Sequence, residues 1–309
     1  MTTPPHPAIP GGAIPIGTKV LTQPQAGATG RVGVVLDASE TSEGTYRVRF
    51  AAGDEGAFRR TELTIFKHAD GAVPGGPKPE SLFRFVQFRC IVGSRAYGLD
   101  REGSDVDRRG FFLPPARLHW GLAGIPEQLE SDREECYWEV EKFIRLALKA
   151  NPNVLECMYS PLVETCTPLA RELIDIRGMF LSRHIHRTYN AYVLSQFKKM
   201  ERDIRNAGAP RWRHVMHLIR LLLSGVVVLK EGFVPLRVEE HRERLLAIRR
   251  GEIPWDEIEA WRLRLHRELD EALLTTALPE HPDYARANEF LLKARRHAAS
   301  AEYESEAAG

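Results

Sequence analysis

The spacing of apolar residues changes along the chain, and this change limits the possible architecture more than any other feature. Short segments between residues 14 and 68 alternate apolar and polar positions, most clearly over residues 46–50. Such alternation is typical of strands with one buried face. Beyond Pro168, apolar residues recur at helical spacing almost to residue 299. Because strands and helices occupy different parts of the sequence, the chain is predicted to be an α+β protein.

A segment rich in Gly, Pro and charged residues, 69–81, separates two parts of the chain and is predicted to be a linker. The short strands before it resemble the small SH3-like barrels of the KOW and Tudor type. The segment after it combines apolar strands with a helical pattern, as expected of an α/β domain with a mixed sheet. The full division is a disordered leader at 1–13, the barrel at 14–68, the linker at 69–81, the α/β domain at 82–166, a helical domain at 167–300 and an acidic tail at 301–309.

Four arginines lie in the predicted barrel, and their role is open. Arg47, Arg49, Arg59 and Arg60 could contact nucleic acid, or they could form a solvated face of a packing or docking module. Charge runs on such small units are usually solvated, which favours the second interpretation.

Composition excludes some classes of partner. The 43 Lys and Arg residues nearly balance the 42 Asp and Glu residues, so the net charge of +1 gives no global field that would attract nucleic acid or a membrane. The N-terminal residues lack a basic region followed by an apolar one, and no apolar run reaches the roughly 20 residues that a membrane helix needs. The cysteines form no CxxC pair, as expected of reduced thiols. We therefore expect a cytoplasmic protein without a membrane partner.

Two helix starts can be read from capping residues. Thr167 followed by Pro168 is a favourable start for a helix. Asn153 with Glu156 three positions later resembles a capping box, which predicts a short helix before the one that starts at Thr167.

The phrase that carries chemistry is CIVGSRAYGLDREGSDVDRRGFFLPP, residues 90–115. An apolar strand runs into Gly93 and Ser94, where a small residue and successive backbone N–H groups can approach a phosphate. Asp105 and Asp107 flank one apolar residue and would lie on the same face of a second strand. Two adjacent carboxylates repel each other unless a cation joins them, and Mg²⁺ takes one or two carboxylates together with substrate phosphates. Nearby arginines could neutralise a triphosphate: Arg95, Arg101, Arg108 and Arg109.

This order of Gly-Ser, a spacer and Ser-Asp-x-Asp is similar to the motif of the DNA polymerase beta nucleotidyltransferase superfamily. More narrowly, "GSRAYGL", "GSDVDRRGFFL", "EKFIRLALKANPNVLECMYSP" and "RHVMHLIRLLL" resemble a bacterial and phage family of nucleotidyltransferases, some associated with RNA repair. The resemblance covers about residues 83–230 and leaves the N-terminal part of the chain unexplained.

The resemblance implies a metal-dependent site with assigned roles. Asp105 and Asp107 match the metal-binding pair, and a third carboxylate is expected on a neighbouring strand, where family spacing favours Glu134 over Glu135. Two Mg²⁺ ions are expected, with Mn²⁺ as an alternative. The nucleotide-binding residues implied by the motif and by local charge are Gly93, Ser94, Arg95, Ser104 and Arg109.

The predicted reaction transfers a nucleoside monophosphate, for example from ATP, to a hydroxyl of RNA, a protein or a small molecule and releases pyrophosphate. The alternative is a weakly catalytic regulatory protein on the same fold that binds nucleotide or RNA. The third carboxylate distinguishes the two, because catalysis needs it and binding does not. The helical segment with Arg213, His214, His217 and Arg220 could line the site or be a solvated face.

Overall fold

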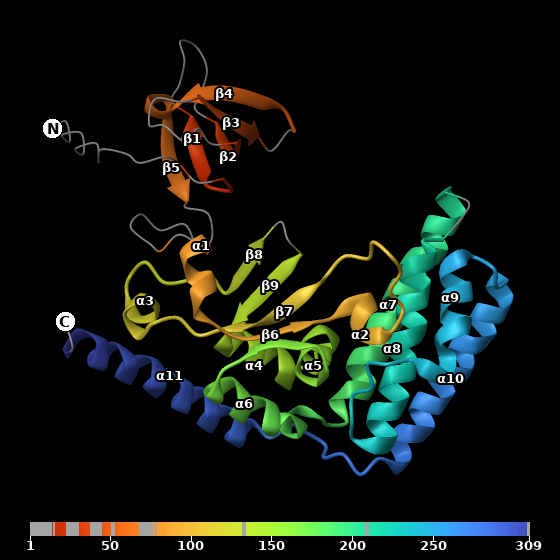
Figure 1. The fold of residues 1–309 in the computed structure, drawn as a ribbon. Coiled ribbons are helices and arrows are strands. Elements are labelled where there is room, and N and C mark those ends of the chain that lie inside the picture. Colours follow the sequence, from red (N-terminus) through yellow and green to blue (C-terminus); the bar gives the residue numbers. More distant parts are fainter. Residues whose placement is uncertain are drawn as a thin grey trace. The chain divides into compact units, whose positions relative to one another are not determined.

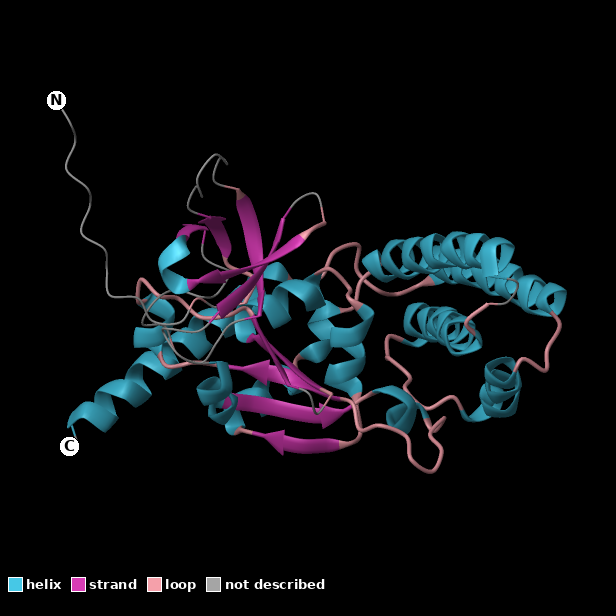
Figure 2. Cartoon of the chain, turned by 90° about the horizontal axis from the view of Figure 1, so that it is seen from above, coloured by secondary structure: helices cyan, strands magenta, loops and turns pink. Residues whose placement is uncertain are grey.

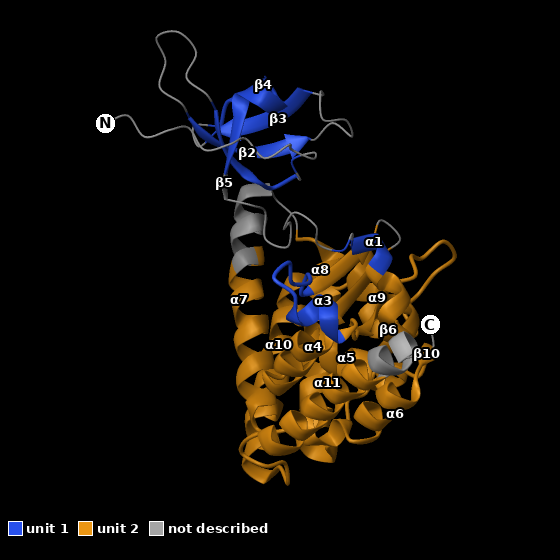
Figure 3. Cartoon of the chain, turned by 90° about the vertical axis from the view of Figure 1, so that its left-hand side faces the viewer, with its two compact units in different colours: residues 1–81, 116–127 blue, residues 82–115, 128–309 orange. Residues whose placement is uncertain are grey.

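The computed structural model describes residues 14, 16–22, 31–37, 45–50, 53–67, 77, 79–131, 134–207 and 210–307. The predicted leader at 1–13 and most of the predicted linker lie outside the described residues. The chain divides into two compact units (Figure 3): residues 1–81 with 116–127, and residues 82–115 with 128–309.

The first unit contains an antiparallel sheet of five strands in the order β4-β3-β2-β1-β5. The strands are β1 (Lys19–Thr22), β2 (Val32–Asp37), β3 (Thr45–Phe50), β4 (Glu55–Arg59) and β5 (Leu63–Lys67). Tyr46, Val48 and Phe50 are buried and the residues between them are exposed, which confirms the alternation. The described strands pair only in this open order, with β4 and β5 at its two ends, so the predicted SH3-like barrel is not confirmed.

The arginines on the outer face of β3 have acidic partners. Arg49 pairs with Glu55 at 2.8 Å, and Arg47 lies 3.8 Å from Asp37. Arg31, just before β2, pairs with Asp54 at 2.7 Å. These pairs neutralise the positive charge along the strand and favour the solvated-face interpretation over a nucleic-acid surface.

The second unit is built on a mixed sheet in the order β10-β6-β7-β9-β8, in which β7 and β9 are parallel and the other pairs antiparallel. Helices α4, α5 and α6 lie along this sheet (Figure 1). The strands are β6 (Val86–Ile91), β7 (Arg108–Phe112), β8 (Gln128–Ser131), β9 (Glu135–Glu139) and β10 (Val163–Cys166). The shorter helices of this unit are α2 (Gly93–Tyr97), α4 (Val140–Leu148), α5 (Pro152–Tyr159) and α6 (Pro168–Asp175). Helix α3 (Ala116–Trp120) and most of α1 (Pro79–Leu82) belong to the first unit.

Three helices pack against α8 (Trp212–Glu231) and form a bundle around it (Figures 1 and 2). They are α7 (His184–Ala207), α9 (Arg242–Arg250) and α10 (Trp255–Thr275). The last helix, α11 (Tyr284–Ala307), packs against α4 (Figure 1). Within the described ranges α8 is the one helix long and apolar enough to cross a membrane. Its most apolar stretch of 18 residues is 67% buried in the protein, as in a core helix. α11 continues to Ala307, beyond residue 301, where the predicted tail begins.

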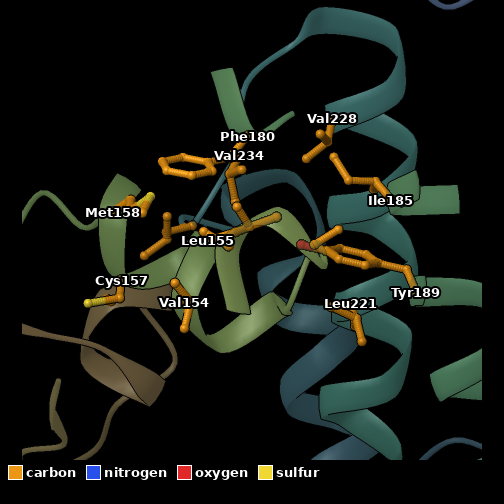
Figure 4. Packing of buried hydrophobic residues seen from close by; sticks show 14 of the residues in the cluster. Val154, Leu155, Cys157, Met158, Phe180, Ile185, Tyr189, Leu221, Val228 and Val234 are labelled. Atoms are coloured by element: carbon orange, nitrogen blue, oxygen red, sulfur yellow. The ribbon is translucent and has the colours of Figure 1, made fainter. Parts of the chain in front are cut away.

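The core is continuous from the sheet to the bundle. Leu155 and Met158 of α5 pack beside Phe180, while Tyr189 of α7 and Leu221 of α8 lie opposite them (Figure 4). All five side chains are at most 4% exposed. The helical bundle and the sheet are therefore one packed body within the second unit.

The two predicted helix starts have different outcomes. The Thr167 side chain accepts a hydrogen bond from the Ala170 N–H at the start of α6, so that prediction is confirmed. The capping box of Asn153 with Glu156 is wrong, because Asn151 is the N-cap of α5 and accepts from the N–H groups of Asn153 and Val154. Pro152 fills the first helical position, which sets the helix start two residues earlier.

Candidate active site

The two motif carboxylates line one small cavity of about 180 Å³ in the second unit. Asp105 and Asp107 lie in the loop before β7, so the expectation that both sit within the strand is wrong. The Asp107 carbonyl nevertheless accepts a hydrogen bond from the Val92 N–H at 2.9 Å, which extends the pairing of β6 and β7 to this residue. The sheet thus fixes Asp107, and the loop places Asp105 beside the same cavity.

Gly93 brings the backbone of α2 against Asp107. Its φ is +70°, a left-handed conformation, and a Cβ atom at this position would overlap the Asp107 carboxylate. Ser94 follows it, is buried, and lines the cavity with the two carboxylates. Only glycine combines this conformation with this close approach.

The loop between α2 and β7 is held by its own hydrogen bonds. Ser104 Oγ accepts from the Arg101 N–H at 2.9 Å, and the Arg95 guanidinium donates to the Ser104 carbonyl at 2.9 Å. Ser104 lines the small cavity, whereas Arg95 does not. Arg95 therefore supports the loop that carries Asp105.

Three arginines from distant parts of the sequence line the small cavity, and we call Arg101, Arg213 and Arg249 the arginine cluster. Burial, and then the like charges of Arg101 and Arg213, lower the pKa of Arg249. A cavity lined both by mutually repelling cations and by the motif carboxylates suits an anion that also carries a metal ion, such as a polyphosphate.

The other motif arginines have partners outside the cavity. Arg108 forms an ion pair with Glu164 at 2.8 Å, and Glu164 raises the pKa of Arg108. Arg109 donates to the carbonyl of Glu134 at 2.8 Å and lies 3.7 Å from Asp107. Arg109 lines neither of the two cavities of the site. Its charge acts on the site only by attracting the Asp107 carboxylate.

A larger cavity of about 510 Å³ adjoins the first and shares with it Ser94, Asp107 and Arg213. His217 of α8 lines it, and burial, followed by nearby cations led by Arg220, lowers the pKa of His217 to about 3. His217 is therefore neutral at physiological pH and can both donate and accept hydrogen bonds. Polar residues from three further elements complete the wall: Lys149, Asn151, Asn153, Thr188 and Tyr192.

Glu134 and Glu135 stand at the start of β9, next to β7 in the sheet. Glu134 is exposed and has a φ of +57°, and its carbonyl accepts from the N–H of Arg108 at 3.0 Å. Glu135 pairs in register with Arg108, and neither glutamate lines the two cavities. Within the described ranges no three His, Cys, Asp or Glu side chains form a group that could hold a metal ion without another ligand.

Some residues of the site have no strong local signal in the sequence. Arg249 follows the buried Leu245 by four positions, which places it on the inner face of α9. The next residue is also an arginine, Arg250, and the sequence alone does not show which of the two lines a cavity. Glu156 was interpreted as a capping residue, yet it is buried and pairs with Arg220 at 2.8 Å.

The close approach at Gly93 leads to a prediction with a matched control. Gly93→Ala and Gly98→Ala should each lower the free energy of unfolding by about 1 to 2 kcal/mol, because both glycines have a φ of +70°. Only Gly93→Ala should also abolish the thermal shift caused by Mg²⁺ and nucleoside triphosphate, since nothing lies within 4 Å of a Cβ at Gly98. Equal thermal shifts for both variants would show that Gly93 does not position Asp107.

Two comparisons with known proteins give matches to this chain. The model of the RNA repair pathway DNA polymerase beta family matches residues 80–293, well over half of the chain. The uncharacterized protein YcgL of Bacillus subtilis (strain 168) is 28% identical over 82 residues, which are 25% of this chain and 32% of that protein. The matched segment thus spans about a third of the length of this relative.

Proposed function

Because the chain belongs to the RNA repair pathway DNA polymerase beta family, we propose that it is a metal-dependent nucleotidyltransferase that uses a nucleoside triphosphate. The acceptor hydroxyl oxygen bonds to the α-phosphorus, the bond from this phosphorus to the pyrophosphate oxygen breaks, and the hydroxyl proton is released. The observation that carries the proposal is that Asp105, Asp107 and the arginine cluster line the same small cavity.

The residues present fit a divalent metal ion. Asp105 and Asp107 offer carboxylate oxygens on one cavity, and Mg²⁺ usually takes one or two protein carboxylates and completes its shell with water and substrate phosphates. Asp105 and Asp107 would hold Mg²⁺, or Mn²⁺ in its place, and two ions are proposed. When bound, the metal lowers the pKa of the attacking hydroxyl and stabilises the charge on the phosphates.

The protein itself supplies phosphate binding and orientation. Ser94 and the arginine cluster would hold the triphosphate in the small cavity, because guanidinium groups donate paired hydrogen bonds to phosphate oxygens. The larger cavity, which shares Asp107, would take the nucleoside and the end of the acceptor. Its neutral His217 and the side-chain amides of Asn151 and Asn153 can form hydrogen bonds with hydroxyl groups and with the edges of bases.

RNA is the proposed acceptor because the family takes its name from RNA repair. The test is to incubate the protein with Mg²⁺, each labelled nucleoside triphosphate in turn and RNA with a free hydroxyl end. Labelled RNA and released pyrophosphate are the expected products. Nucleotide binding without transfer to any acceptor would favour the alternative of a regulatory nucleotide-binding protein.

The third carboxylate is tested by a pair of neighbouring variants. Glu134→Gln should lower the rate of transfer by about two orders of magnitude, the usual scale for loss of an acid-base group, and leave nucleotide binding intact. Glu135→Gln should change little, because family spacing assigns the third carboxylate to Glu134. The opposite pattern would assign the role to Glu135. If both variants stay active, neither glutamate is the third carboxylate; Glu139 and Glu141, the next acidic residues along the chain, pair with Arg295 and Arg145 and line neither cavity.

A further inference from the structure

A buried ion pair at the larger cavity joins a helix of the sheet to the helical bundle. Glu156 of α5 and Arg220 of α8 lie 2.8 Å apart, with side chains that are 3% and 6% exposed. Burying two charges costs several kcal/mol of desolvation each, and an apolar pair of similar volume is often equally stable. The pair therefore needs a reason other than stability.

The third member of this arrangement is Tyr97, the last residue of α2. Its hydroxyl donates to the Glu156 carboxylate, and the guanidinium carbon of Arg220 lies 3.7 Å from the centre of its ring. Burial raises the pKa of Tyr97 far above its usual range, so the phenol remains a donor. Burial opposes the charge of Arg220, but the nearby Glu156 and Tyr97 raise its pKa.

The first residues of α2, at its other end, belong to the proposed site. Gly93 is the first residue of this short helix and packs against the Asp107 carboxylate, four positions before Tyr97. The bundle also holds the end of α2 through its backbone: Arg242 donates to the Gly98 carbonyl at 2.9 Å and Arg249 to the Leu99 carbonyl at 3.0 Å. One turn of helix thus connects the buried pair with the carboxylate.

We propose that Tyr97, Glu156 and Arg220 are positioning residues, which lock α2 so that Gly93 and Ser94 face Asp107 in the geometry that transfer requires. All three residues border the larger cavity. Oε1 of Glu156 and Nε and Nη1 of Arg220 are nevertheless shielded from solvent, so the charged groups of the pair are directed at each other and act through position. Misplacement of a site by about 1 Å can cost a hundredfold in rate. The site can therefore catalyse transfer only when the helical bundle is packed against α2.

The first test is amide hydrogen exchange in the full chain without ligands. The N–H groups of Gly98 and Leu99 donate to the carbonyls of Arg95 and Ser94, so they report on the order of α2. Exchange there should rise about tenfold in Tyr97→Phe and in Glu156→Gln, while exchange in the centre of α8 stays unchanged. The matched control is Glu259→Gln, which breaks the pair of Glu259 with Arg262 on α10 and should leave α2 unaffected.

The second test separates positioning from stability. The apolar double variant Glu156→Leu, Arg220→Met should keep the melting temperature of the wild type, whereas its kcat should fall about tenfold or more with a KM for nucleotide within about threefold. This readout rests on the proposed function, but the exchange readout does not. An inactive wild type with the expected exchange pattern would therefore overturn only the proposed function.

Two results would overturn the positioning role. One is unchanged exchange at Gly98 and Leu99 in both single variants. The other is full kcat in a folded apolar double variant, which would leave the pair with a structural role alone.

Discussion

Asp107→Asn is expected to remove Mg²⁺-dependent binding of nucleoside triphosphate and to slow transfer by at least about two to three orders of magnitude, since a metal site contributes several kcal/mol to the transition state. Asp105→Asn should have a similar effect, because both side chains line the cavity of the arginine cluster. Calorimetric titration with nucleotide, with and without Mg²⁺, measures the binding.

Asp100→Asn is the matched control for both variants. Asp100 lies in the same loop, is exposed, and lines neither cavity. It should bind nucleotide like the wild type. Mg²⁺-dependent binding that survives the double change of Asp105 and Asp107 would contradict the assignment of the metal ligands.

Arg249→Met is expected to weaken the binding of nucleoside triphosphate by about tenfold or more, because the variant loses charged hydrogen bonds to phosphate. The thioether side chain keeps much of the volume, so α9 should remain folded. The effect should shrink as the salt concentration rises, since salt screens the attraction between the arginine cluster and the phosphates.

Arg250→Met provides the control for this prediction. Arg250 is the next residue of α9, is exposed, and pairs with Glu252 at 2.6 Å. It should bind nucleotide normally. Equal losses in both variants would indicate a general effect of charge on α9, and no loss in Arg249→Met would remove Arg249 from the phosphate site.

Local patterns in the sequence predicted much of the fold. Alternation at Tyr46, Val48 and Phe50 predicted the buried face of β3, and Thr167 predicted the start of α6. The apolar strands and the helical pattern expected after the linker include β9 and α4. These features depend on neighbours two to four residues apart, which a sequence displays directly. Closure of the predicted barrel depends on pairing between distant strands, and it was not confirmed.

The candidate site shows the same limit. The sequence placed Gly93, Ser94, Asp105 and Asp107 in one motif, because they lie within one short segment. Arg249 joins them only through the packing of α9, so no local pattern separates it from Arg250.

Pairs across the fold are the hardest part to predict. Glu156 and Arg220 are 64 residues apart, and each alone is typical of a helix surface. The glutamates before β9 remain a prediction, because the turn at Glu134 with its φ of +57° interrupts the alternation that would fix which side chain faces Asp107.

The most direct test of the proposed reaction is the fate of each phosphate. The protein is incubated with Mg²⁺, RNA and nucleoside triphosphate labelled either at the α-phosphate or at the γ-phosphate. Nucleotidyl transfer predicts that the α-label enters RNA, that the γ-label leaves as pyrophosphate, and that both products vanish when Asp105 and Asp107 are changed to Asn. Transfer of the γ-label to RNA, or products that persist in the double variant, would contradict a nucleotidyltransferase site at these carboxylates.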